Sequence, residues 1–402
     1  MATATLVYLT YLGVILLIAL LCSIISQKLK IPNILLLVLT GIVINHIPYA
    51  GGKLIEFPTE FLTSIAILAL VMIVFDSTSK LKLKEVDDFF LRSLEITITF
   101  LIVNILLLSV AAYFILEVNV LPALIFASLM TGTSPSVVLT LMAESKNKVI
   151  ELLKIEALIN TPVTVIIPLL LLSLMNDISA GTSAISDGLS SFITYEFVSF
   201  LQQIIAGLGA GVLVGLIVFK AMRAKYSDQL SPIAIIAAAL LAHVLAENLG
   251  GSGVLAVTTL GLLFGKITLR QKEHILDFST IFSKFLEILV FVFVGLLITL
   301  TPDPWFYLQS IGLFAIYLLI RFVSVYITLR NEYKIKQVLF MTLNVPKGIA
   351  VAVVVFTILA GSVTVGLETV LNVAMMFLVY SIILATVVAR LSKYFLGTTI
   401  VK

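Results

Sequence analysis

The chain has 402 residues, of which 60% are hydrophobic and only 12% are charged, and its formal net charge is +3. A soluble domain cannot bury that much apolar surface, so the composition excludes a water-soluble protein. A transmembrane β-barrel is disfavoured, because its strands would alternate polar and apolar residues and the sequence shows no such alternation.

The apolar segments predict an all-α membrane protein with about thirteen transmembrane helices. The first segment has no lysine or arginine before it, so we expect a spanning helix and not a cleaved signal peptide. The single cysteine, Cys22, excludes an intramolecular disulfide and a cysteine-based metal cluster. In chain order, the predicted spans are 5–26, 31–47, 60–76, 93–117, 120–143, 150–175, 197–219, 231–249, 252–265, 278–300, 304–329, 337–361 and 367–389.

Basic residues are concentrated in every second loop between these spans. One set of loops and the C-terminal tail hold 21 of the 25 lysines and arginines, and the alternate loops hold only Lys53. The positive-inside rule therefore predicts an N-terminus outside the cell membrane and a C-terminus in the cytoplasm. Three basic residues, Lys284, Arg321 and Lys347, fall within spans. Charges at membrane depth are costly, so each of them marks a functional-site hypothesis.

The order of the spans suggests an internal repeat within a single transmembrane domain, 1–402. A long outer loop and a glycine-rich span make up residues 176–225, and this segment has the place of a linker helix between two halves. Six spans precede it in 1–175 and six follow it in 226–402, so the halves would have opposite orientations. Inverted repeats of this kind are the usual scaffold of alternating access.

Two corresponding spans are interrupted by helix-breaking residues. Span five contains Thr131–Ser136 and span twelve contains Asn344–Gly348, each with a proline and a glycine. Paired interruptions near mid-depth point to a transport site, where two discontinuous helices cross. Two unrelated proline kinks are the alternative. At the first break, the hydroxyls of Thr133 and Ser134 could coordinate an ion or could only cap the broken helix.

Span six carries a polar face close to the same depth. Glu156 and Asn160 are four residues apart and share a helix face, and Thr161 lies beside them. Lys347 lies at a similar depth in span twelve, so we expect an ion pair between Glu156 and Lys347. That pair could be structural, or it could move and titrate.

Other charged residues could contribute to transport. Asp76, at the cytoplasmic end of span three, either lines an access funnel or is a helix-end charge beside Lys80. Glu287 in span ten has Arg321 and Lys284 as expected partners, and structural ion pairing is the favoured interpretation.

Five segments of the chain form a recognisable set: Lys30–Pro32, Thr133–Pro135, Glu156–Pro162, Gly250–Ala256 and Pro346–Gly348. Together they resemble the monovalent cation:proton antiporter superfamily. The resemblance covers essentially the whole chain, and it implies a homodimer in which spans four to six and eleven to thirteen move like an elevator against a dimerisation domain.

The chain departs from this family at two positions. The family usually has aspartate where this chain has Ser134 and Thr161, and the second aspartate binds the cation and the proton in turn. With Glu156 anionic and Lys347 cationic, the expected site is neutral and keeps no spare carboxylate. Coupling would then depend on Glu156, on Lys347 or on another carboxylate.

The leading hypothesis is a secondary active transporter that exchanges sodium or potassium for protons across the lipid bilayer. An antiporter scaffold without ion coupling, acting as a facilitator of another solute or as a membrane sensor, is the alternative. A membrane-embedded enzyme is a third class, for which clustered catalytic side chains are missing. No phosphate loop, zinc motif or catalytic triad occurs, so we expect no cofactor, no metal beyond the transported cation and no nucleic-acid partner.

Overall fold

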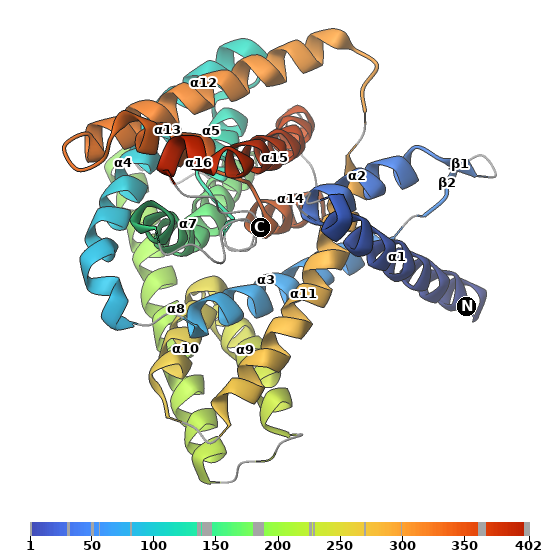
Figure 1. Cartoon of the computed structure of the whole chain (residues 1–402), viewed down its shortest axis with the longest axis vertical. Coiled ribbons are helices and arrows are strands. Elements are labelled where there is room, and N and C mark those ends of the chain that lie inside the picture. Colours follow the sequence, from blue (N-terminus) through green and yellow to red (C-terminus); the bar gives the residue numbers. More distant parts are fainter. Residues whose placement is uncertain are drawn as a thin grey trace. The chain divides into compact units, whose positions relative to one another are not determined.

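The computed structural model describes 2–29, 33–49, 52–55, 57–80, 83–134, 138, 147–179, 189–224, 227, 230–268, 271–298, 300–360 and 367–397. Within these residues the regular secondary structure is helical apart from one short hairpin (Figure 1). The helices are α1 (Ala2–Leu29), α2 (Asn33–Asn45), α3 (Thr59–Ser79), α4 (Leu83–Leu116), α5 (Val120–Leu129), α7 (Lys148–Ser179), α8 (Leu189–Ala224), α9 (Leu230–Asn248), α10 (Gly253–Lys266), α11 (Lys272–Leu297), α12 (Pro304–Leu329), α13 (Ile335–Leu343), α14 (Ile349–Ala360), α15 (Leu367–Arg390) and α16 (Ser392–Leu396).

The predicted fold class is confirmed, and the predicted spans are found as helices of two lengths. Nine helices in the described part of the chain are long and apolar enough to cross a membrane. Four shorter apolar helices, α2, α5, α10 and α14, fall within the predicted spans 31–47, 120–143, 252–265 and 337–361. The count of thirteen crossings stays a prediction.

Helix ends differ from the predicted span ends around the predicted outer loop 176–196. Helix α7 continues to Ser179, and α8 already begins at Leu189. A helix satisfies its own backbone hydrogen bonds in lipid and in water, so its end need not coincide with the end of the apolar run. The sequence also gave no indication of the hairpin of β1 (Pro48–Tyr49) and β2 (Gly52–Lys53), whose strands pair antiparallel.

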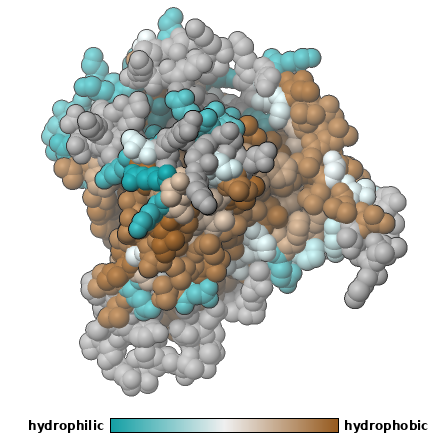
Figure 2. Space-filling model, turned by 90° about the horizontal axis from the view of Figure 1, so that it is seen from below, coloured by the Kyte–Doolittle hydropathy of each residue, from teal (hydrophilic) through white to brown (hydrophobic). Residues whose placement is uncertain are grey.

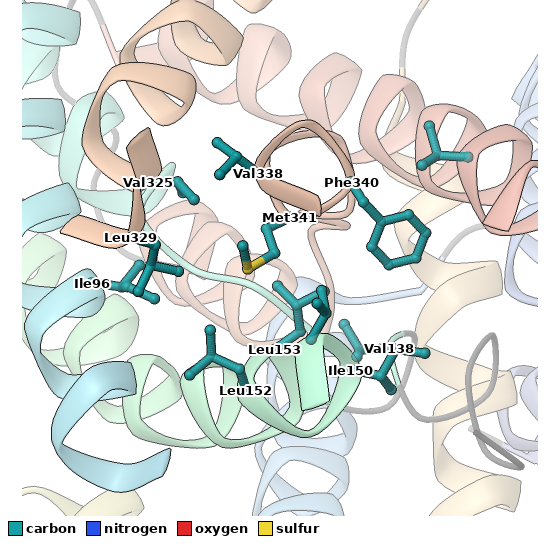
Figure 3. Close-up of a cluster of buried hydrophobic side chains, with 12 residues drawn as sticks. Ile96, Val138, Ile150, Leu152, Leu153, Val325, Leu329, Val338, Phe340 and Met341 are labelled. Atoms are coloured by element: carbon teal, nitrogen blue, oxygen red, sulfur yellow. The ribbon is translucent and has the colours of Figure 1, made fainter. Parts of the chain in front are cut away.

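The chain forms two compact units, and each unit draws on both predicted halves. The first unit comprises Met1–Ala66, Phe89–Pro168 and Leu286–Lys402. One of its cores joins α4, α7, α12, α13 and α15 through fully apolar side chains (Figure 3). Figure 3 shows Val338 and Met341 of α13 among the side chains of α7 and α12. This packing fixes α13, the helix that leads into the second break, against its neighbours.

Two glycines allow α2 and α11 to cross in backbone contact within the first unit. A Cβ added at Gly41 would collide with the backbone of Val292 and Gly295, and one added at Gly295 would collide with Val38 and Gly41. Beyond the crossing, the Asn45 side chain donates a hydrogen bond to the Ile298 carbonyl at 3.0 Å. Only glycine permits this approach, because the opposing atoms are backbone.

The second unit comprises Ile67–Asp88 and Leu169–Phe285, and α8, α9 and α10 pack together in it (Figure 1). On α8, Gly207 and Gly211 lie directly against the backbone of α10, as expected for small residues between membrane helices. Gly209, on the same helix, has open space beside it. The role of α8 as a linker between inverted halves stays a prediction.

Apolar side chains also cover much of the surface seen in Figure 2. Among those of the described residues that are more than half exposed are Leu106 and Leu107 on α4 and Ile205, Leu216 and Ile217 on α8. Exposed apolar surface of this extent is typical of a protein that faces lipid.

Candidate functional site

The candidate site is built from two interrupted helices of the first unit. Helix α5 ends at Leu129, and the backbone of Thr131–Ser134, which follows it, is not helical. The second interruption separates α13, ending at Leu343, from α14, beginning at Ile349. Pro346 lies in the second gap, where its missing N–H and fixed φ oppose helix formation. The rest of the first predicted break, including Pro135 and Ser136, lies outside the described residues.

The two interruptions touch each other. The backbone N–H of Ser134 donates to the carbonyl of Pro346 at 2.7 Å. Gly348 is packed so closely that an added Cβ would collide with the side chain of Ser134. The two breaks therefore meet, as expected where discontinuous helices cross, and their contact is between Ser134 and the segment Pro346–Gly348.

Lys347 connects the second break to carbonyls exposed by the first. Its ammonium Nζ donates to the carbonyls of Met130 at 2.6 Å and Gly132 at 2.7 Å, and to the hydroxyl of Tyr317 at 2.7 Å. The side chain is fully buried, and its backbone N–H donates to Ser381 Oγ at 2.9 Å. The carbonyl end of a helix carries a partial negative charge, so the ammonium stabilises the broken end of α5.

The predicted ion pair between Glu156 and Lys347 is wrong, because Glu156 pairs with Arg321. The Nη2 atom of Arg321 lies 2.6 Å from Oε1 and 2.7 Å from Oε2 of Glu156. Both side chains are buried, and the guanidinium lies over the ring of Phe100, 4.6 Å from its centroid. Arg321 was expected beside Glu287 of α11, which is half-buried. Glu156 belongs to α7 and Arg321 to α12, so the ion pair joins these two helices.

Polar side chains at the first break are bound mainly to backbone. Asn160 donates from Nδ2 to the carbonyl of Thr131 at 2.8 Å, and Thr161 donates to Ala157 of its own helix at 2.7 Å. Thr164 donates to the amide oxygen of Asn160 at 3.2 Å. Buried Thr133 Oγ1 has no hydrogen-bond partner among the residues that the structure describes. Asn160 therefore fixes the shape of the break.

The charge of the site also differs from the neutral site that the sequence suggested. In the described part of the chain, the buried ionisable charges are those of Glu156, Arg321 and Lys347. Two positive charges and one negative charge leave a formal net charge of +1 when all three are ionised. Arg321 accounts for the difference, since the sequence placed it in another pair.

The sequence analysis did not identify Tyr317 as a site residue. It is fully buried, and its ring centroid lies 4.4 Å from the ammonium of Lys347. It precedes Arg321 by four residues, so both lie on one face of α12. The charge of Arg321 within a span was the signal that could have identified this face.

Asp76 belongs to the second unit and forms a cluster there. Its carboxylate accepts from Lys80 Nζ at 2.7 Å and from Thr280 Oγ1 at 2.9 Å, which joins α3 to α11. Lys80 also donates to Thr280 at 2.6 Å. Of the residues proposed from sequence, the first unit contains Thr133, Ser134, Glu156, Asn160, Thr161, Glu287, Arg321 and Lys347.

The chain matches the family model described as "Sodium/hydrogen exchanger, transmembrane" over residues 15–392. The K(+)/H(+) antiporter NhaP2 of Shewanella sp. (strain MR-4) is 24% identical over 285 residues, which are 70% of this chain and 48% of the relative. The Na(+)/H(+) antiporter NhaH of Halobacillus aidingensis is 28% identical over 326 residues, covering 75% of this chain and 76% of that protein. The chain thus spans about half the length of the NhaP2 relatives.

The structure also matches a solved antiporter fold. The sodium proton antiporter MjNhaP1 from Methanocaldococcus jannaschii aligns with a TM-score of 0.80 at 18% sequence identity. The alignment covers 97% of this chain and 99% of that one. At this identity the likeness establishes the fold.

Proposed function

The chain belongs to the family of transmembrane sodium/hydrogen exchangers, and we propose that it exchanges a monovalent cation, Na⁺ or K⁺, for protons by alternating access. It is a multi-pass membrane protein of a transporter family. Relatives named as K(+)/H(+) and Na(+)/H(+) antiporters support the exchange reaction. An enzymatic role has no comparable support.

The position of the Lys347 ammonium is the observation that carries this proposal. It is bound by two backbone carbonyls and a hydroxyl, which are ligands that alkali cations also accept. One positive charge can occupy these oxygens at a time. Protonated Lys347 therefore excludes the cation, and a deprotonated Lys347 leaves Met130 and Gly132 available to bind it. Mutual exclusion at one site gives antiport when the site changes sides only in its occupied states.

Glu156 has a structural part in this scheme. Its carboxylate is occupied by Arg321 and is fully buried, so it is not free to follow a cation through the cycle. Lys347 remains as the group that exchanges a proton. Asp76, whose oxygens are bound by Lys80 and Thr280, would act before the cation reaches the site, as part of the access route.

The larger movements are proposed from the family resemblance and from the loop charges. Spans four to six and eleven to thirteen would form a core that carries the site in an elevator movement against a dimerisation domain. Two copies of the chain would form a homodimer. The basic loops would face the cytoplasm, with the N-terminus outside.

Purified protein in liposomes that contain a pH-sensitive dye tests the exchange. An outward or inward gradient of Na⁺ or K⁺ should drive proton movement in the opposite direction. Wild-type protein that shows no response to sodium, potassium or lithium at acidic, neutral and alkaline pH would contradict the proposed function.

Replacement of Lys347 by methionine tests its part in coupling. Lys347→Met should abolish cation-dependent proton flux, because it removes the proton and keeps most of the side-chain volume. Lys272→Met is a matched control: Lys272 also caps a helix end, donating to the carbonyls of Gly265 and Ile267 outside the site. The control should retain exchange. Both variants should elute as folded protein in size-exclusion chromatography.

A scaffold without ion coupling is the second candidate, and Ser134 and Thr161 in place of the family's aspartates favour it. The Thr161 hydroxyl bonds to its own helix in this structure. The wild type would then be inactive. If only the aspartates are missing, Thr161→Asp, alone or with Ser134→Asp, should create sodium-dependent exchange. Wild-type exchange that depends on Lys347 would exclude this candidate.

A further inference from the structure

Among the described residues, Tyr317 is the one side chain that bonds to the ammonium of Lys347, whose other two acceptors are backbone carbonyls. The tyrosine is buried and lies among Phe100, Phe314 and Phe377, with ring centroids 5.8 to 5.9 Å from its own. This packing holds the hydroxyl in place beside Nζ. The hydroxyl differs from the carbonyls because it can accept or donate a hydrogen bond.

The two protonation states of lysine require different partners. An ammonium has three N–H donors, and the three oxygens around Nζ accept all of them. A neutral amine has two N–H donors and one lone pair. Until a cation takes the two carbonyls, they can keep accepting from the amine's N–H groups, and the hydroxyl of Tyr317 can turn its proton toward the lone pair.

We propose that Tyr317 is the positioning residue that sets the pH at which Lys347 releases its proton, by accepting from the ammonium and donating to the amine. The inference rests on the proposed function, since it takes Lys347 as the proton-carrying group. The other charges that act on Lys347 among the described residues are Arg321 on α12 and Glu156 on α7. Those two charges are paired with each other, which leaves Tyr317 as the adjustable partner.

Tyr317→Phe removes the hydroxyl and keeps the ring. It leaves one N–H of a buried ammonium without an acceptor, and this costs more than a neutral lone pair without a donor. Lys347 should then lose its proton more readily. We expect the pH of half-maximal exchange to move about one unit lower, as follows from a single hydrogen bond to a charged group.

Tyr380→Phe is the matched control. Tyr380 belongs to the same aromatic cluster through Phe314, and its hydroxyl bonds to Ser310 Oγ at 3.0 Å and not to Lys347. Its loss should leave the pH profile in place. An unchanged profile in Tyr317→Phe, a shift toward higher pH, or an equal shift in Tyr380→Phe would overturn the inference.

Site-specific replacement of Tyr317 by 3-fluorotyrosine covers the case in which Tyr317→Phe does not fold. Fluorine makes the hydroxyl a stronger donor and a weaker acceptor while the side chain stays almost the same size. Both effects favour the neutral amine, so the profile should again move to lower pH. An active fluorotyrosine protein with the wild-type profile would overturn the inference.

A second readout separates this inference from the proposed function. ¹⁵N-lysine NMR of the purified protein follows the ammonium of Lys347, whose signal is identified by its absence from Lys347→Met. The pH at which this signal disappears should be lower without the Tyr317 hydroxyl, whether or not the protein transports. A wild type without flux then contradicts the proposed function alone, and an unshifted signal contradicts the role of Tyr317.

Discussion

At the scale of single residues, the buried pair of Glu156 and Arg321 joins two helices of the site. Breaking such a pair from one side leaves an uncompensated buried charge. Glu156→Gln and Arg321→Gln should therefore each destabilise the protein by about 3–5 kcal/mol. The double substitution should cost clearly less than the two single costs added together, because no unpaired charge remains. Thermal unfolding of the four proteins in detergent measures this coupling.

Transport measurements on the same variants separate a structural pair from a proton carrier. If Glu156 is structural, the double variant should regain exchange along with stability. A stable double variant without exchange would show that Glu156 or Arg321 takes part in transport itself. Strictly additive destabilisation would show that the two charges do not depend on each other.

The sequence grouped Glu156, Asn160 and Lys347 in one site but assigned the wrong partners to the charges. Depth follows from residue counts along a span, and this brought Glu156, Asn160 and Lys347 together. Partner choice depends on how each helix is rotated about its axis, and residue counts do not supply that rotation. In the structure, Arg321 points toward Glu156 of α7, and Lys347 donates to the carbonyls of Met130 and Gly132. Tyr317 was missed because an aromatic residue in an apolar span resembles any other core residue.

At the scale of helices, the crossing of α2 and α11 depends on two glycines that face each other. Gly41→Ala and Gly295→Ala each place a methyl group against backbone atoms of the opposite helix, which cannot rotate away. Overpacking of this kind costs about 1–3 kcal/mol. Both variants should therefore show lower thermal unfolding midpoints than the wild type.

Gly312→Ala is the control for this prediction. Gly312 lies within α12 and has open space where a Cβ would be built. Alanine also favours a helix over glycine by about 1 kcal/mol, so this variant should be as stable as the wild type or more so. Equal effects at all three positions would show that the close crossing does not limit stability.

Sequence reasoning located the interruptions of the helices well and their packing poorly. Proline and glycine act on their own backbone, so the ends of α13 and α14 are visible from Asn344–Gly348 alone. A crossing such as that of α2 and α11 joins positions more than 250 residues apart. No local pattern contains that information.

At the scale of the whole molecule, the loop charges predict which ends of the helices face the cytoplasm. Asn248, the last residue of α9, should be outside, and Lys334, just before α13, should be inside. Cysteines can be placed at either position after Cys22→Ser, in which the serine hydroxyl replaces the thiol in the contact with Thr40. A membrane-impermeant maleimide should label Asn248→Cys and not Lys334→Cys in intact cells. The reverse labelling would invert the proposed topology.

The charge carried through the cycle follows from the composition of the site. With Lys347 protonated and no cation bound, the buried groups sum to +1, from Arg321, Lys347 and Glu156. With Lys347 neutral and one Na⁺ in its place, the sum is again +1, so a complete cycle of the proposed exchange moves no net charge across the membrane. Sodium-driven proton flux in liposomes should therefore be unchanged by an imposed membrane potential of either sign. Flux that follows the potential would mean that a second proton takes part, and that Lys347 is not the sole carrier.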